Sequence, residues 1–278
     1  MLGQLGTDAK FLAGGQSLIP LLKLRFANPK HLVDLSFIKD TSYIAENSGA
    51  IRFGAMTRHA EIEHSALAQK IPVLHDCAAG IADVQIRNRG TIGGSLAEAD
   101  PSGDWANALI TLDTKIYCLG KNGDRSLPLK DFVTDAYTTA LEHDELVKEI
   151  EVKIPPQGSG GAYIAFKRSA PVYPSASVAV QLTMQGNVCK EAAIALGCVG
   201  LTSIRAGEAE VSLRGKSVDE KAIATASEAA RAAADPQFDM RGSADYKRQL
   251  VVALVKRAIQ IAMRRARGER VEGSHLYA

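Results

Sequence analysis

The chain has 278 residues, of which 46% are hydrophobic and 23% are charged, and its formal net charge is +2. This composition is typical of a globular protein large enough for two or three subdomains, and the charge gives no general indication of nucleic-acid binding. No apolar stretch is long enough to cross a bilayer, and no basic segment followed by an apolar one opens the chain. We therefore expect a cytoplasmic protein without a transmembrane segment.

The first half of the chain alternates short apolar strands with helical stretches. We expect strands at 9–13, 31–35, 50–54, 115–119 and 146–154. We expect helices at 18–25 and 105–112, and a helical stretch that begins at residue 57. Pro72 either breaks that stretch or starts a second helix. Asp104 stands directly before the last of these helices, where a carboxylate can cap the first turn. These elements predict a mixed α and β domain.

Residues 157–161, Gln-Gly-Ser-Gly-Gly, follow two prolines and are the best candidate for a domain boundary. Beyond them we expect strands at 162–167, 175–184 and 192–199, the second with one buried face. Ser217 to Glu220 has the spacing of a capping box before an alanine-rich helix, and a last helix is expected at 245–267. The second half should thus be a sheet covered by helices.

The last helix carries eight basic residues between Lys247 and Arg270. A basic helix can bind nucleic acid or an anionic surface. Without interleaved aromatic residues, we prefer the simpler interpretation that these side chains solvate its outer face and favour the helix dipole. We expect no nucleic-acid partner.

The four cysteines, Cys77, Cys118, Cys189 and Cys198, form no C-x-x-C pair. An iron–sulfur or zinc site within this chain is therefore not expected, and buried free thiols are the simplest interpretation.

Two glycine pairs with hydroxyl residues nearby are the main candidates for a binding site. Gly14-Gly15 follows an apolar run and precedes Ser17, whereas Gly93-Gly94 lies between Thr91 and Ser95. Paired glycines can turn with positive φ and present free N–H groups to an anion. Either pair alone is more often a simple turn, but two such pairs could hold the two phosphates of a diphosphate. No G-x-G-x-x-G, complete P-loop or G-x-S-x-G motif is present.

Three segments together resemble the FAD-binding medium subunit of molybdenum hydroxylases, the family of carbon monoxide dehydrogenase medium chains and of the xanthine dehydrogenase flavin domain. They are Ala13-Gly14-Gly15-Gln16-Ser17-Leu18, Thr91-Ile92-Gly93-Gly94-Ser95-Leu96 and Asp100-Pro101-Ser102-Gly103-Asp104. The resemblance implies an α+β fold with a PCMH-type, vanillyl-alcohol-oxidase-like FAD-binding domain. Its two α+β subdomains would span 1–55, which is short at its N-terminal side, and 56–156. A C-terminal domain of antiparallel sheet with helices would span 162–278.

The resemblance also implies a set of FAD-contacting residues. The first glycine segment would wrap the diphosphate, the second would complete the groove, Asp104 would meet cofactor hydroxyls, and Val147 and Lys167 would lie near the flavin ring. The residues implied are Lys10, Phe11, Leu12, Ala13, Gly14, Gly15, Gln16, Ser17, Leu18, Ile81, Ala82, Thr91, Ile92, Gly93, Gly94, Ser95, Ala97, Gly103, Asp104, Val147 and Lys167. The amides of all four glycines of the two pairs are expected to face the diphosphate. Tyr173, in the loop 169–174, could cover the ring.

The function implied is that of an electron-transfer oxidoreductase subunit. A large subunit would hold the molybdenum cofactor and a small subunit [2Fe-2S] clusters, in a dimer of heterotrimers, and FAD on this chain would pass electrons to an external acceptor. Two alternatives stay open at this point. One is a stand-alone flavin oxidoreductase of the same fold, and the other is a non-enzymatic nucleotide-binding module whose basic last helix docks a partner.

Overall fold

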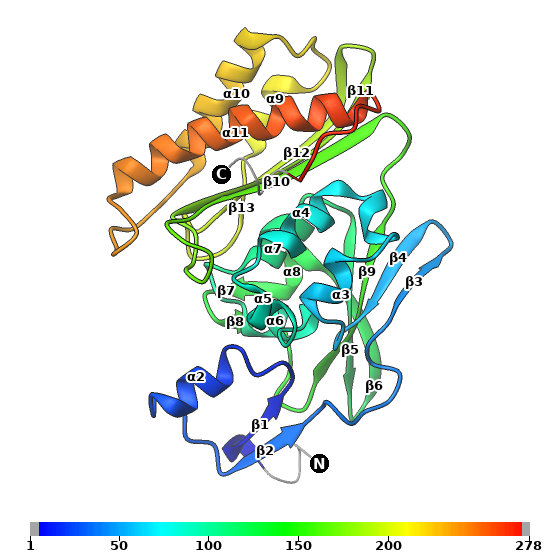
Figure 1. The fold of residues 1–278 in the computed structure, drawn as a ribbon, viewed down its shortest axis with the longest axis vertical. Coiled ribbons are helices and arrows are strands. Elements are labelled where there is room, and N and C mark those ends of the chain that lie inside the picture. Colours follow the sequence, from blue (N-terminus) through cyan, green and yellow to red (C-terminus); the bar gives the residue numbers. More distant parts are fainter. Residues whose placement is uncertain (1–5, 274–278) are drawn as a thin grey trace.

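The computed structural model describes residues 6–273 and shows three parts stacked along the long axis of the molecule (Figure 1). A small lobe contains the first two strands and α2. A five-stranded sheet with helices on one face forms the middle, and a four-stranded sheet with three helices forms the opposite end. Within the described residues, no helix is long and apolar enough to cross a membrane.

The small lobe consists of β1 (Ala9–Leu12), β2 (His31–Asp34) and α2 (Leu18–Lys23), preceded by a 3₁₀ turn at Gly6–Asp8. The two strands pair in parallel, which requires the crossover that α2 supplies. All three elements agree with the predicted ones. None of the α2 residues is buried, so this lobe has little core of its own.

The middle sheet has the antiparallel strand order β3-β4-β9-β5-β6. Its strands are β3 (Ile44–Asn47), β4 (Ala50–Gly54), β5 (Thr114–Gly120), β6 (Gly123–Pro128) and β9 (Leu146–Lys153), and a separate ribbon pairs β7 (Val133–Asp135) with β8 (Thr138–Thr139). Strand β3 was not expected from the sequence, because it is an edge strand whose side chains are mostly exposed and show no buried alternation.

Short helices cover one face of this sheet and bury Phe53, Trp105 and Phe132 completely. They are α3 (His59–Glu63), a 3₁₀ turn at Ala68–Lys70, α4 (Pro72–Gly80), α5 (Val84–Arg87), α6 (Ile92–Glu98), α7 (Asp104–Leu109) and α8 (Leu129–Phe132). Pro72 starts a new helix, which was one of the two predicted outcomes, because proline is tolerated in a first turn.

The second half forms an antiparallel sheet in the order β10-β11-β12-β13. Its elements are β10 (Ser159–Phe166), β11 (Ala176–Gln185), β12 (Val188–Gly197), β13 (Ile204–Arg205), α9 (Gly207–Leu213), α10 (Glu220–Ala233) and α11 (Ala244–Ala266). The expectation of a single buried face for β11 is wrong. Val178 and Val180 face the helices, whereas Ala179 on the other face packs into the core of the middle part. The sheet is therefore sandwiched.

Two local predictions in this half are also wrong. Strand β10 begins at Ser159 and not at residue 162, so Gly160 and Gly161 belong to it, and a Cβ on Gly160 would lie 2.1 Å from the carbonyl oxygen of Ala262 in α11. Helix α10 begins after Asp219, whose carboxylate accepts the Ala222 N–H at 2.8 Å, so Ser217 does not cap it. Ser217 instead forms an isolated bridge with Val188, before the helix begins.

The basic residues of α11 do not all solvate its outer face. Lys247 is 2% exposed and pairs with Asp239, and the Arg265 side chain is 7% exposed and pairs with Asp76. Both side chains point inward because carboxylates outside α11 pair with them, the fully buried Asp76 and the partly exposed Asp239.

Candidate cofactor-binding site

The loop between β1 and α2 offers a row of backbone donors. Among the described residues, none of the amides from Ala13 to Leu18 donates a hydrogen bond within the chain. Gly15 has a φ of +73°, which turns the loop at the end of β1. The hydroxyl of Ser17 makes no capping bond to α2. Successive unpaired amides in a turn are the arrangement that binds anions, so this loop fits a phosphate group.

The second glycine pair does not form the expected loop turn. It lies in the first turn of helix α6. Thr91 is its N-cap, and its Oγ1 accepts the Gly94 N–H at 3.2 Å. The Gly93 N–H donates to the Ala55 carbonyl oxygen at 2.9 Å. The expectation that the amides of Gly93 and Gly94 are free to bind a diphosphate is therefore wrong, because α6 and its neighbours already satisfy them.

Glycine at these positions serves close packing. A Cβ on Gly93 would lie 2.5 Å from the Cβ of Ala55, and a Cβ on Gly14 would lie 2.3 Å from the carbonyl oxygen of Arg89. Such distances are far below van der Waals contact, so neither position has space for a side chain.

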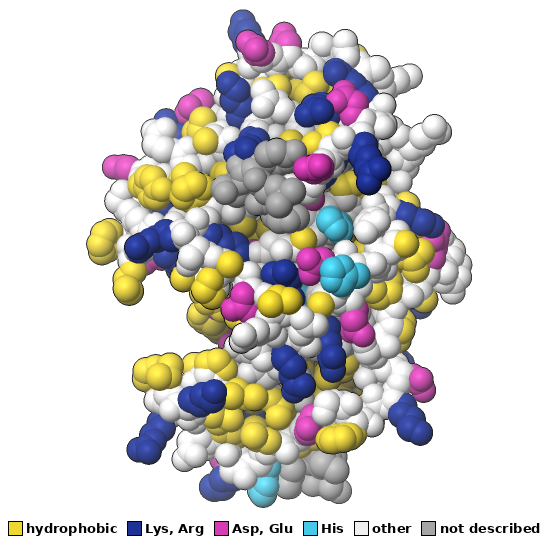
Figure 2. Space-filling model, viewed as in Figure 1, with side chains coloured by type: hydrophobic (Ala, Val, Ile, Leu, Met, Phe, Trp, Pro, Cys, Tyr) yellow, Lys and Arg dark blue, Asp and Glu magenta, His cyan; other side chains and the backbone are white. Residues whose placement is uncertain are grey.

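The two glycine segments meet in space. Gly14 lies against the backbone of Arg89 and Gly90, just before α6, and a Cβ on Gly94 would be 3.4 Å from the Cβ of Ala13. Figure 2 shows a notch, bordered by hydrophobic side chains, between the lobe that carries α2 and the body of the molecule. The segments that most resemble a cofactor site in the sequence thus adjoin in the fold, although 70 residues or more separate them.

Hydroxyl and basic side chains flank this junction. The Ser95 hydroxyl, on the first turn of α6, makes no hydrogen bond among the described residues. Lys10 on β1 is exposed, and its charge acts on the half-buried Glu98, whose pKa is raised by burial first and by Asp100 second. Gln16 donates from its amide to the Gly14 carbonyl oxygen at 3.1 Å.

The remaining residues of the two glycine segments differ in exposure. Phe11, Leu12, Ala13, Ser17 and Leu18 are partly buried, Ile92 is fully buried, and Gln16 and Ala97 are exposed. Only the partly buried and exposed ones can contribute side chains to a groove.

Asp104 lies beneath the surface rather than at it. Gly103, not Asp104, is the N-cap of α7, so the expected capping role is wrong. The Asp104 carboxylate accepts the Tyr163 hydroxyl at 2.6 Å. Burial raises the pKa of Asp104, and the charge of Lys167 and the hydrogen bond from Tyr163 oppose that rise. A contact between Asp104 and a cofactor hydroxyl stays a prediction.

A pocket lies between α4 and β10. It has a volume of about 300 Å³ and is lined by Ala79, Gly80, Ala82, Arg87, Tyr163, Ala165, Lys167, Ser169 and Ala170. The Lys167 ammonium donates to the Gly80 carbonyl oxygen. Ala82 has a φ of 42°, and Ile81 beside it is buried. The pocket therefore gathers two of the predicted residues, Ala82 and Lys167, whereas Val147 is buried in the core of the middle part and is not among the lining residues.

Tyr137 was not among the residues predicted from the sequence, although it lies close to Asp100. Burial and then the charge of Asp100 raise the pKa values of both Tyr137 and Tyr173, so the two phenols lie close to the same carboxylate. Tyr137 has a φ of 54°, a conformation that is rare for a residue with a side chain and often found at functional sites. No local sequence pattern predicts this conformation, in which the Tyr137 N–H donates to the distant Ala99 carbonyl oxygen.

Comparisons with known proteins match both halves of the chain. Residues 1–156 match the FAD binding domain in molybdopterin dehydrogenase, and residues 161–262 match the CO dehydrogenase flavoprotein C-terminal domain. The carbon monoxide dehydrogenase medium chain of Hydrogenophaga pseudoflava is 40% identical over 266 residues, which are 95% of this chain and 93% of that protein. Subunit alpha of the 6-hydroxypseudooxynicotine dehydrogenase complex of Paenarthrobacter nicotinovorans is 38% identical over 278 residues, 99% of this chain and 94% of that one.

A solved structure of carbon monoxide dehydrogenase from Hydrogenophaga pseudoflava, lacking the Mo-pyranopterin moiety of the molybdenum cofactor, superposes with a TM-score of 0.92. It is 41% identical and covers 95% of this chain and 92% of that one. The expected fold class, a FAD-binding domain followed by a C-terminal domain of sheet and helices, is confirmed.

Fold and matches together define a flavoprotein, an oxidoreductase subunit with FAD as its cofactor. The chain belongs to the FAD-binding medium subunits of the molybdenum hydroxylase family, as its sequence motifs predicted.

Proposed function

We propose that this chain is the electron-transfer subunit of a heteromeric molybdenum hydroxylase. It would receive electrons from [2Fe-2S] clusters on a small subunit and pass them to an external acceptor, while a large subunit holds the molybdenum cofactor. The observation that carries the proposal is the junction of the two glycine segments, where the amides from Ala13 to Leu18 lack acceptors among the described residues. When bound, FAD would supply the redox chemistry that no side chain can provide.

The residues of the junction have distinct roles in this proposal. The amides of the β1–α2 loop and the Ser17 hydroxyl hold the diphosphate without a cationic side chain. The Ser95 hydroxyl adds a donor from the opposite side. Gly93 and Gly94 act indirectly, because their lack of side chains lets α6 approach Ala55 and Ala13. Lys167 places a positive charge in the pocket with Ala82, where it would favour a negatively charged flavin ring.

The assembly we propose is a dimer of heterotrimers in the cytoplasm. The names of the relatives as medium chain and as complex subunit support an assembly of several chains. The four cysteines are free and buried, which agrees with a reducing compartment. The relatives act on carbon monoxide and on 6-hydroxypseudooxynicotine, by their names, so the substrate of this complex is not inferred from them.

Ser17 offers a clean test of the diphosphate site. Ser17→Asp places a negative charge among the free amides, and aspartate is as good a helix N-cap as serine, so the chain should still fold. We expect the FAD affinity of the full chain to fall at least about tenfold, which corresponds to roughly 1.4 kcal/mol. Ser17→Asn is neutral, caps equally well, and should retain FAD. Equal flavin content in wild type and Ser17→Asp would refute this placement of the diphosphate.

The metal content of the purified protein separates the electron-transfer subunit from a stand-alone flavin oxidoreductase. A tagged chain purified from its native host should carry molybdenum and iron in fixed proportion to FAD, measured by elemental analysis and by absorbance. An active chain that holds FAD but neither metal would favour the stand-alone enzyme. A purified chain that holds no flavin, with or without the metals, would exclude both the electron-transfer subunit and the stand-alone flavin oxidoreductase.

A further inference from the structure

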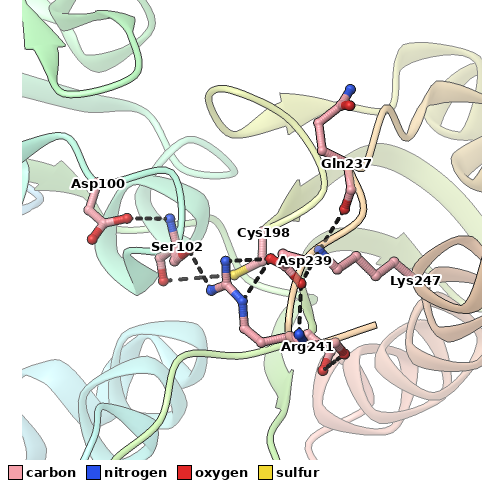
Figure 3. Close-up of polar contacts among 8 residues, drawn as sticks. Asp100, Ser102, Cys198, Gln237, Asp239, Arg241 and Lys247 are labelled. Atoms are coloured by element: carbon pink, nitrogen blue, oxygen red, sulfur yellow. Dashed lines mark hydrogen bonds and ion pairs between the residues drawn. The ribbon is translucent and has the colours of Figure 1, made fainter. Parts of the chain in front are cut away.

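Arg241 links the C-terminal domain to the segment that follows α6. Its Nη1 donates to the Ser102 hydroxyl at 2.8 Å across the domain boundary (Figure 3). Its Nε and Nη2 donate to Asp239 at 3.0 and 2.7 Å. The Asp239 carboxylate also forms an ion pair with the Lys247 ammonium, at an N–O distance of 2.8 Å, and Lys247 is almost completely buried at the start of α11. The guanidinium is therefore held by the partly exposed Asp239, which the buried Lys247 also pairs with, while its Nη1 donates to Ser102.

Ser102 lies at the centre of the link between α6 and α7. Its N–H donates to Asp100 at 2.8 Å, and its carbonyl oxygen accepts the Cys198 thiol at 3.7 Å. The side chain is 7% exposed. Gly103, which follows directly, is the N-cap of α7, so Ser102 lies next to the first turn of that helix.

Residues in an unfavourable backbone conformation surround this link. Ala99, which ends α6, Tyr137 and Cys198 have φ values of 49°, 54° and 63°. The Tyr137 N–H donates to the Ala99 carbonyl oxygen at 2.9 Å, and the Cys198 N–H donates to that of Pro101 at 3.3 Å. Non-glycine residues stay in this region only when several contacts hold them there. The bond from Arg241 to Ser102 differs from the two backbone bonds just named, because its donor is charged.

We propose that Arg241 is a positioning residue of the FAD site, which holds Ser102 and thereby keeps α6 and its Ser95 against the β1–α2 loop. The proposal rests on the proposed function, because it concerns the same site. Arginine suits the role better than lysine, since its planar fork serves Asp239 and Ser102 at the same time. The Ser175 hydroxyl donates to the Arg241 carbonyl oxygen at 2.9 Å, so the same residue also anchors the end of the loop that carries Tyr173.

The test compares FAD binding by full-length variants, with FAD as the probe. We expect Arg241→Gln to weaken FAD affinity on the order of tenfold and Arg241→Lys to weaken it less. Ser102→Ala removes only the hydroxyl, whereas Arg241→Gln also removes the pair with Asp239, so Ser102→Ala should weaken FAD affinity by no more than Arg241→Gln does. The double variant should be no weaker than Arg241→Gln alone, because that variant has already lost the Ser102 contact. Arg231→Gln, on the exposed side of α10, breaks an ordinary surface pair with Glu228 and serves as the control.

Two further measurements distinguish positioning from a general loss of stability. The visible circular dichroism of bound flavin should change in Ser102→Ala as in Arg241→Gln, whereas the thermal midpoint of FAD-free Ser102→Ala should stay at the wild-type value, because Arg241 retains its pair with Asp239. Unchanged FAD affinity in Arg241→Gln, or additive losses in the double variant, would overturn this inference and leave the proposed function intact. A wild-type chain without FAD affinity would instead overturn the proposed function.

Discussion

Asp76 on α4 and Arg265 near the end of α11 form a two-pronged ion pair between the two halves of the chain, with N–O distances of 2.6 and 3.1 Å. The side chains are 0% and 7% exposed. Asp76 also accepts the Tyr163 N–H at 3.2 Å, and Arg265 donates to the Gly161 carbonyl oxygen at 2.7 Å. The pair therefore joins α4, β10 and α11 at one buried point.

Arg265→Leu should destabilise the protein strongly, because it removes the guanidinium that forms two hydrogen bonds with the buried Asp76 carboxylate. We expect a loss of about 3–5 kcal/mol in the free energy of unfolding, measured with chemical denaturant. Arg264→Leu, one residue earlier, breaks an exposed pair with Glu269 and should change stability by less than about 0.5 kcal/mol. Similar losses in both variants would contradict the assigned role of the buried pair.

Gly14→Ala should separate the two glycine segments. The added methyl group would lie 2.3 Å from the Arg89 carbonyl oxygen, so the β1–α2 loop must move away from α6. We expect FAD content to fall and stability to drop by about 1–3 kcal/mol, the usual cost of overpacking. Gly207→Ala is the matched control, because a Cβ there has nothing within 4 Å. Normal flavin content in Gly14→Ala would show that close approach of the segments is not needed.

His59 should make the stability depend on pH. It is buried, and its Nδ1 accepts the Trp105 indole N–H at 3.0 Å. Burial, and then the charge of Arg87, lower the pKa of His59 from 6.5 to about 4. The unfolded chain therefore binds a proton as the pH falls through 6.5, while the folded chain binds it only near pH 4.

The stabilising contribution of neutral His59 is complete above pH 6.5 and declines between pH 6.5 and 4, by about 3 kcal/mol in total. Trp105 fluorescence during denaturation at each pH measures this decline. His59→Gln retains an acceptor for Trp105 and should lose most of this pH dependence. His64→Gln, at an exposed position, should retain it. Parallel pH profiles for wild type and His59→Gln would refute the assignment.

The four thiols should be unreactive in the folded protein. Burial raises the pKa values of Cys118 and Cys189 to about 11 and that of Cys198 to about 12, so the reactive thiolate is scarce at neutral pH. Ellman's reagent should label none of the four thiols in the native chain and all four after denaturation. Fast labelling of any cysteine in the native chain would contradict its burial.

Much of the fold could be predicted from the sequence, because its signals are local. The run before Gly14 predicted β1, the apolar period after Ser17 predicted α2, and the 250–261 stripe predicted α11. The exposed edge strand β3 has no such period and was missed. The motifs around Gly14 and Gly93 also led to the family, because each motif is contiguous in the chain.

Local residue patterns were enough to show which segments could form the site and which family they resemble. What each group does there became clear in the folded chain: among the described residues, the amides from Ala13 to Leu18 have no acceptor, whereas those of Gly93 and Gly94 bond to Ala55 and Thr91. Folding also turned Arg265 inward to Asp76, although the basic run predicted a solvated face. The physical reason is that a hydrogen bond or ion pair needs a partner at about 3 Å, and partners distant in the chain meet only after packing has brought their elements together.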